Sequence, residues 1–221
     1  GSIVRDGLTP PTVLNAALAA IGFALLLGLY LCQQTTWLLF PVGLACAAVG
    51  YLYSGGPYPI SATPLGEIVS GITMGTVIIS ISYFLQTGTV TSYVLLVSVP
   101  TSVLIGAILM ANNIRDLDDD RRHGRRTLAI LLGRRGATTC LAAMLAAAYL
   151  WIVLLVAAGS LPLWGLAVFA SIPKAAAAVR GFRQASTPQS LMPAMVATAQ
   201  TNTLFGFCLT IGLLTAYWLS I

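Results

Sequence analysis

The chain has 221 residues, of which 57% are hydrophobic and 8% are charged. Soluble domains carry about 25% charged residues, so this composition excludes an ordinary soluble enzyme and indicates an integral membrane protein. The formal charge of +5 is explained by membrane topology and gives no reason to expect a nucleic-acid partner. The apolar runs have the length of about 20 residues that a helix needs to cross a bilayer, and they lack the alternation of barrel strands. We therefore expect an all-α polytopic protein within the lipid bilayer.

Seven membrane-spanning helices are predicted in chain order. Thr9 followed by Pro10 and Pro11 is typical of a helix start, with a hydroxyl cap and proline in the first turn. Residues 54–64 hold three prolines and two glycines, which excludes a regular helix there. A polar loop is expected after the sixth span, holding Lys174, Arg180 and Arg183. The spans are expected at about residues 11–31, 37–53, 65–85, 91–114, 137–158, 161–178 and 191–219.

The charges fall on one side of this arrangement. With seven spans the loops alternate between two faces, and every Lys and Arg lies in segments of the same face. The opposite loops, near Gln33, Gly88 and Gly159, carry no charge. The positive-inside rule makes the charged face cytoplasmic. We therefore expect a multi-pass protein of the cell inner (cytoplasmic) membrane, with any charged site on its cytoplasmic side.

The segment 111–132 is the most distinctive part of the sequence. It holds four of the six acids, five of the eleven Lys and Arg residues and the only His. Asn112, Asp116 and Asp120 repeat every fourth residue, so on a continuing helix they form one stripe of oxygen ligands. Asp118 and Asp119 point away from that stripe. Charges at the end of an apolar helix are costly near lipid, which favours a functional site.

The residue types in this segment suit a metal-bound polyanion. Two carboxylates one turn apart suit Mg²⁺, which completes its shell with water and substrate phosphates. Arginines bind anionic oxygens directly, bidentately where geometry allows. A diphosphate with a long apolar tail between the helices satisfies both features, and its ionisation needs metal ions and arginines to stabilise the departing charge. The alternative is a solvated loop whose charges pair locally and fix topology. The arginines concerned are Arg115, Arg121, Arg122, Arg125 and Arg126.

The same segment resembles the second aspartate-rich motif of the UbiA superfamily of intramembrane prenyltransferases. The matching residues are Asn112-Asn113-Ile114-Arg115-Asp116, Asp120, Gly124-Arg125-Arg126-Thr127-Leu128-Ala129 and Leu132-Gly133. The Asn-Asn-x-Arg-Asp beginning and the Gly-x-Arg-Thr-Leu-Ala ending are similar to the 1,4-dihydroxy-2-naphthoate branch, which makes demethylmenaquinone. The loop from Tyr53 to Pro59 followed by Leu65-Gly66-Glu67 also fits that branch.

The resemblance implies a nine-helix bundle with a lateral opening to lipid and a polar cavity on its cytoplasmic side. Two aspartate-rich motifs would hold Mg²⁺ and a polyprenyl diphosphate, and the ring of an aromatic acceptor would attack the allylic carbon with loss of diphosphate and carbon dioxide. Residues 1–221 would form a single transmembrane domain with seven of the nine helices. We expect the first motif and the first two helices to be missing before Gly1.

The resemblance implies roles for the residues of the stripe, and the chemistry of the nearby side chains suggests which residues bind the substrates. Asn112, Asp116 and Asp120 would be catalytic, with Asp116 and Asp120 as the metal ligands. The residues expected to bind the substrates are Arg115, Arg121, Arg125, Arg126, Asn113, Tyr51, Tyr53 and Tyr58.

Several of these residues have a simpler interpretation. The tyrosines could form an interfacial aromatic belt instead of stabilising a carbocation. Glu67 could be a cavity residue or an acid that complements the dipole of its helix. His123 could relay a proton or sit in a solvated loop, and Lys174, Arg180 and Arg183 could contact the diphosphate or only fix topology. Gln200 and Asn202 could reach the cavity or bond another helix.

Two other functions remain open on the sequence alone, and the missing motif argues against a third. A related transferase could use another acceptor, such as 4-hydroxybenzoate. A non-enzymatic lipid-binding or transport protein would place its charged site near the midplane, within internal repeats, and none is evident. A phosphatidyltransferase would also use Mg²⁺ and carboxylates, but its Asp-Gly…Ala-Arg…Gly…Asp…Asp pattern is not evident.

Overall fold

The computed structural model of the protein describes residues 7–219. Within these residues every element of regular secondary structure is a helix, and turns and loops connect them. Arg5 and Asp6, which the sequence places on the charged face, lie outside the described residues. The chain divides into two compact units, Gly1–Gly50 and Tyr51–Ile221. The assignment of residues 1–221 to a single transmembrane domain stays a prediction.

The first unit contains α2 (Pro10–Gln34) and most of α3 (Leu39–Ser54), which continues into the second unit. Thr9 precedes α2 with extended backbone and proline follows in the first turn, as predicted, although the Thr9 hydroxyl bonds Thr12 and does not cap a backbone N–H. The helix is almost entirely apolar and carries no charged side chain. Its length and composition are sufficient to cross a membrane.

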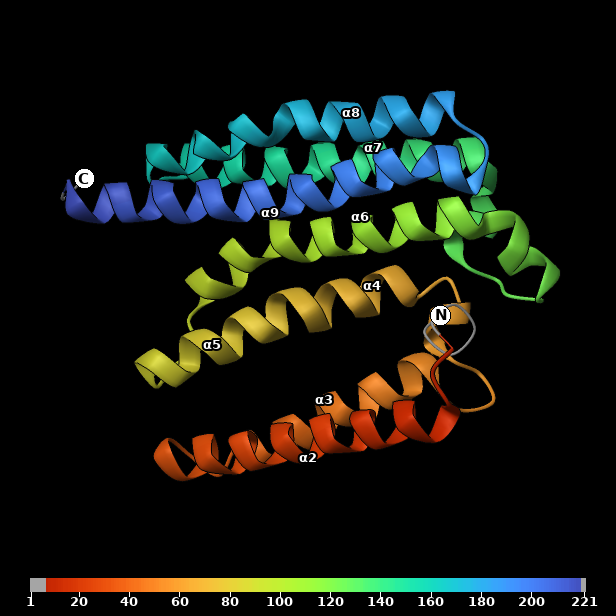
Figure 1. Ribbon diagram of the computed structural model, residues 1–221. Coiled ribbons are helices and arrows are strands. Elements are labelled where there is room, and N and C mark those ends of the chain that lie inside the picture. The colour runs from red at the N-terminus through yellow and green to blue at the C-terminus, as the bar shows by residue number, and fades with distance from the viewer. Residues whose placement is uncertain (1–6, 220–221) are drawn as a thin grey trace. The chain divides into compact units, whose positions relative to one another are not determined.

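The second unit is built around α6 (Figure 1). A short 3₁₀ turn, η1 (Ile60–Ala62), leads to a helical rod made of α4 (Gly66–Gly71), the π-helix η2 (Ile72–Val77) and α5 (Ile78–Thr87). This rod packs on one side of α6 (Ser92–Arg122), while α7 (Leu128–Ala157) and α9 (Pro188–Trp218) pack elsewhere on it. The remaining segment is η3 (Leu163–Ser171), a 3₁₀-helix, followed by α8 (Ile172–Gln184).

Local sequence signals set several of these helix boundaries. Thr91 caps α6 by accepting a hydrogen bond from the Val94 N–H. Thr187 and Ser190 form a reciprocal capping box at the start of α9. Gly88 ends α5, and Gly124 follows the end of α6, both with positive φ that glycine adopts without a steric cost.

All seven predicted spans are helical, but some details of the prediction were wrong. Five helical segments of the described residues are long and apolar enough to cross a membrane. The α3 helix is apolar but shorter than these five. The α9 helix is not among them, and it carries the polar residues Gln200 and Asn202. The fifth helix begins nine residues earlier than predicted, with a break at Gly133 (φ 66°). The polar loop predicted to hold Lys174, Arg180 and Arg183 is instead part of α8. Its four consecutive alanines favour a helix, which therefore continues through the charged residues.

The rod and α6 approach each other through small residues. A Cβ atom added at Gly71 would lie 2.5 Å from the Ser102 carbonyl oxygen, so only glycine fits at this crossing. Ser102 Oγ accepts from the Thr76 N–H at 2.8 Å and lies 2.8 Å from Thr76 Oγ1. Small residues and interhelical hydrogen bonds of this kind are what join helices in lipid, where the hydrophobic effect does not.

Candidate functional site

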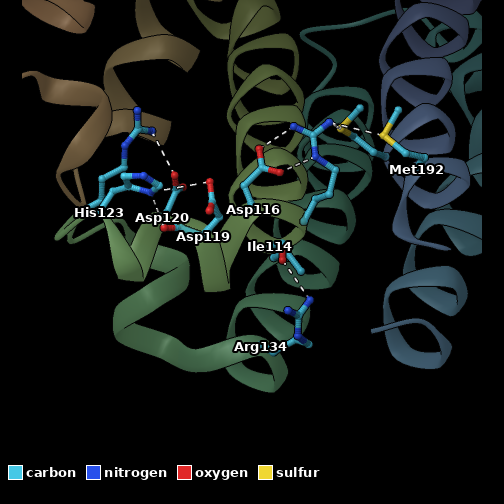
Figure 2. Close-up of polar contacts among 10 residues, drawn as sticks. Ile114, Asp116, Asp119, Asp120, His123, Arg134 and Met192 are labelled. Carbon is cyan, nitrogen blue, oxygen red and sulfur yellow. Dashed lines mark hydrogen bonds and ion pairs between the residues drawn. The ribbon is translucent and has the colours of Figure 1, made fainter. Parts of the chain in front are cut away.

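The α6 helix continues without a break through the acidic segment to Arg122, as the stripe requires. Asn112, Asp116 and Asp120 therefore lie on one side of a single helix. Asp120 is buried, whereas Asn112 and Asp116 are partly exposed. Figure 2 shows Asp116 and Asp120 at successive turns near the end of the helix.

Asp116 forms a bidentate pair with Arg115. The Arg115 Nε donates to Asp116 Oδ1 at 2.7 Å, and Nη2 donates to Oδ2 at 2.5 Å. The third nitrogen, Nη1, lies 3.1 Å from the Met195 sulfur and 3.5 Å from the Met192 sulfur (Figure 2). Arg115 thus joins the carboxylate of α6 to the α9 helix.

Asp120 faces the loop that follows α6. Its carboxylate lies 3.4 Å from Arg125 Nη1, and its backbone carbonyl accepts from the Arg125 N–H at 3.1 Å. The loop is held in turn to η1, because the Arg126 N–H donates to the Ala62 carbonyl at 2.8 Å. Arg121, Arg122 and the Arg126 side chain are exposed, and within residues 7–219 they make no ion pair. These cations are available to an anionic ligand.

The two remaining aspartates of the segment have partners away from the stripe. Asp118 pairs with Arg134 Nη2 at 2.9 Å, and Arg134 Nη1 also donates to the Ile114 carbonyl (Figure 2). Asp119 lies 3.7 Å from the His123 ring, which also contacts the Asp119 carbonyl at 2.9 Å. Both His123 and Asp119 are well exposed, as the solvated-loop interpretation expects.

Asn113 and Glu67 form a buried pair between α6 and α4. Asn113 Nδ2 donates to Glu67 Oε1 at 2.9 Å, and only 4% and 3% of these residues are exposed. Glu67 Oε2 is also buried and has no hydrogen-bond partner among the described residues. Glu67 borders a small apolar cavity of about 230 Å³, distinct from the main one. The structure therefore places Asn113 in a helix–helix interface, one residue away from the stripe.

A larger cavity, of about 780 Å³, adjoins the stripe at Asn112. Its walls are mostly aliphatic and come from the rod, α6, α8 and α9. Polar groups reach it from Asn112, Lys174 and Gln200. A cavity of this kind suits an apolar ligand with few polar groups. Its lining residues are Ser70, Met74, Ile105, Ile108, Leu109, Asn112, Lys174, Met195, Val196, Ala199, Gln200, Thr203 and Leu204.

The predicted tyrosines are not part of this lining. Tyr51 and Tyr58 are 69% and 89% exposed, and Tyr53 is half-buried. Sequence reasoning left Gln200 undecided between the cavity and another helix, and the structure places it at the cavity. The sequence prediction placed Lys174 in a loop, because a lysine near Arg180 and Arg183 is typical of a charged loop, whereas the structure places it in α8 at the cavity.

The carboxylates present suit a metal that takes few protein ligands. Within residues 7–219 no three His, Cys, Asp or Glu side chains come together as a metal site. Asp116 and Asp120 alone would leave most positions to water and phosphate oxygens, which is the arrangement that Mg²⁺ tolerates best.

Comparison with known proteins identifies the family of the chain. The model of the UbiA prenyltransferase family matches residues 2–196. The chain belongs to this family. Membership confirms the resemblance read from the acidic segment and is consistent with a polytopic helical membrane protein.

Individual relatives are similar over much of the chain. It is 51% identical over 218 residues to the 1,4-dihydroxy-2-naphthoate octaprenyltransferase of Bacillus subtilis, covering 99% of this chain and 70% of that protein. The protein of the same name from Mycobacterium tuberculosis is 34% identical over 125 residues, covering 57% of this chain and 43% of the relative. The Mycobacterium leprae protein is 29% identical over 186 residues, covering 84% and 62%. The chain thus spans less than two thirds of the two mycobacterial relatives.

Proposed function

We propose that this protein transfers a polyprenyl group from polyprenyl diphosphate to 1,4-dihydroxy-2-naphthoate in a Mg²⁺-dependent reaction. Diphosphate and the acceptor carboxylate, as carbon dioxide, would leave, giving the reduced form of demethylmenaquinone for menaquinone biosynthesis. The observation that carries the proposal is the carboxylate stripe of α6, which meets a large aliphatic cavity at Asn112. The 51% identity to the Bacillus subtilis enzyme supports the choice of acceptor.

The donor would lie along α6. Its diphosphate belongs at the charged end, where Arg121, Arg125 and Arg126 can donate hydrogen bonds to the oxygens on which charge builds up. The allylic end of its isoprenoid tail would lie beside the acceptor ring in the cavity lined by the rod, α6, α8 and α9, whose aliphatic walls would keep water from the allylic carbon. The amide of Asn112 lies between the two regions and would orient the phosphorylated end.

Family members are generally metal-dependent, and the chain offers a donor set that fits Mg²⁺. Asp116 and Asp120 would hold the ion, with the arginines of the segment balancing their charge. When bound, Mg²⁺ neutralises charge on the departing diphosphate. We place this site on the cytoplasmic side of the cell inner membrane, because the basic residues around it follow the positive-inside pattern.

The proposal is tested with purified protein in nanodiscs, supplied with Mg²⁺, an octaprenyl diphosphate and either dihydroxynaphthoate or 4-hydroxybenzoate. Prenylated products are measured by chromatography. We expect transfer to dihydroxynaphthoate, and a loss of about 100-fold or more in kcat for Asp116→Asn and Asp120→Asn. Each change removes a charge and keeps the shape of the side chain.

Asp119→Asn is the matched control. Asp119 lies in the same segment, but its side chain is 72% exposed and faces His123. Its substitution should leave kcat within about two-fold, as for other surface positions. Full activity in both stripe variants would overturn the role of the carboxylates, and prenylation of 4-hydroxybenzoate alone would replace the proposed acceptor.

A further inference from the structure

Lys174 occupies an unusual depth for a lysine. It is the twelfth residue of the apolar helical segment Leu163–Gln184, which has 22 residues. Ten residues separate it from Gln184, or about 15 Å at the α-helical rise of 1.5 Å per residue. The same separation along α6 lies between Asn112 and Arg122 at the charged end. Lys174 is therefore about half the thickness of a bilayer core away from the end of α8 that carries Arg180 and Arg183.

A lysine at this depth needs an anion or a route to water. Arg180, the nearest charged residue of α8, is six residues or about 9 Å along the helix, which is more than a four-carbon stem spans, so snorkelling alone does not explain the position of Lys174. Ionisable residues inside spanning helices are rare, and by default they indicate a functional site. Here Lys174 is exposed and borders the aliphatic cavity together with Asn112 and Gln200.

The described residues offer no carboxylate to neutralise Lys174. The four aspartates of α6 pair with Arg115, Arg134, His123 and Arg125. Glu67 bonds Asn113 and borders the other cavity. None of the ion pairs among residues 7–219 involves Lys174. The anion that this cation faces is therefore expected to come from a ligand.

The position of Lys174 separates it from the cluster that would hold the diphosphate. Asp116 is one turn, or about 6 Å, closer to the charged end than Asn112, and neither Asp116, Asp120 nor any arginine borders the cavity. A single lysine in a mostly aliphatic lining that also includes the Gln200 amide suits an apolar molecule with one negative charge. The aromatic acceptor of the proposed reaction has this chemistry.

We propose that Lys174 binds the carboxylate of the aromatic acceptor, and thereby sets the orientation of the acceptor ring in the cavity. This inference rests on the proposed function and adds the residue that selects a carboxylated acceptor. A charge-assisted hydrogen bond contributes about 1.5–3 kcal/mol, so its loss should weaken acceptor use by about 10–100-fold.

The test compares Lys174→Met, which removes the charge and keeps most of the length, with the unaltered protein. We expect kcat/KM for dihydroxynaphthoate to fall by about 10–100-fold and the KM for octaprenyl diphosphate to change less than about two-fold. Lys174→Arg should recover part of the loss. Arg135→Gln, which removes an exposed cation outside the cavity, should change neither constant.

A pair of inhibitors isolates the carboxylate itself. 1-Hydroxy-2-naphthoate should bind the unaltered protein more tightly than 1-naphthol, and this preference should disappear in Lys174→Met. An unchanged preference, or a rise in the KM of the diphosphate instead, would overturn the inference. Binding of these fluorescent naphthols is measurable without turnover. Failure of the proposed function would appear separately, as absence of transfer in the unaltered protein.

Discussion

Adding one methyl group at Gly75 tests how closely the helical rod and α6 must approach. A Cβ atom at this position would lie 2.6 Å from Ser102 Cα and 2.9 Å from Ser102 N. Carbon atoms in favourable contact are about 3.5–4.0 Å apart, so Gly75→Ala would force the two helices apart by about 1 Å. The same helices supply Ser70, Met74, Ile105 and Asn112 to the cavity, so its shape would change with them.

The expected loss of stability follows from the hydrogen bonds between the rod and α6 that this movement would break. Ser102 Oγ bonds both the N–H and the hydroxyl of Thr76, and Ser98 Oγ donates to the same hydroxyl at 3.0 Å. Interhelical hydrogen bonds in membrane proteins are worth about 0.6 kcal/mol each, or about 2 kcal/mol for three. Overpacking adds about 1–3 kcal/mol, and alanine returns about 1 kcal/mol of helix propensity. We expect a net loss of about 2–4 kcal/mol.

Thermal unfolding in detergent, followed by tryptophan fluorescence and by residual activity, measures this loss. Gly206→Ala is the control, because Gly206 is also inside a long helix but its added Cβ would meet nothing within 4 Å. Gly206→Ala should be at least as stable as the unaltered protein. If Gly75→Ala unfolds at the same temperature as Gly206→Ala, the close approach at Ser102 does not support the fold.

Three further outcomes follow from the contacts of the site. Glu67→Leu should destabilise the protein by about 1–3 kcal/mol in the same unfolding assay, because it leaves the Asn113 amide buried without an acceptor, whereas Glu67→Gln keeps that acceptor and should cost less. Equal effects of the two would refute a role for this bond. Arg134→Gln should lose about 1 kcal/mol through its bonds to Asp118 and the Ile114 carbonyl, with no change in the KM of either substrate. Chelation of divalent metal should abolish prenyl transfer and added Mg²⁺ should restore it, and activity that survives chelation would contradict the metal proposal.

The sequence alone located the helices and the stripe because both depend on local rules. Apolar runs of bilayer length and the prolines and glycines of the turns act within a few residues, and the structure confirms helices at all seven places. The four-residue spacing of Asn112, Asp116 and Asp120 needed only an unbroken helix, which α6 provides. These are properties that neighbours along the chain decide.

Only the tertiary structure decided which side of each helix borders a cavity and which side packs against another helix. Asn112 borders the large cavity, while Asn113, about 100° further around α6, bonds Glu67 on the opposing helix. Neighbouring asparagines of equal polarity give the sequence no means to tell them apart. A helix that is apolar on all sides has no hydrophobic stripe to show which face meets another helix and which meets a ligand. Lys174 looked like part of a charged loop because Arg180 and Arg183 follow it closely in the sequence, and only the packing of α8 against α9 places it at the cavity.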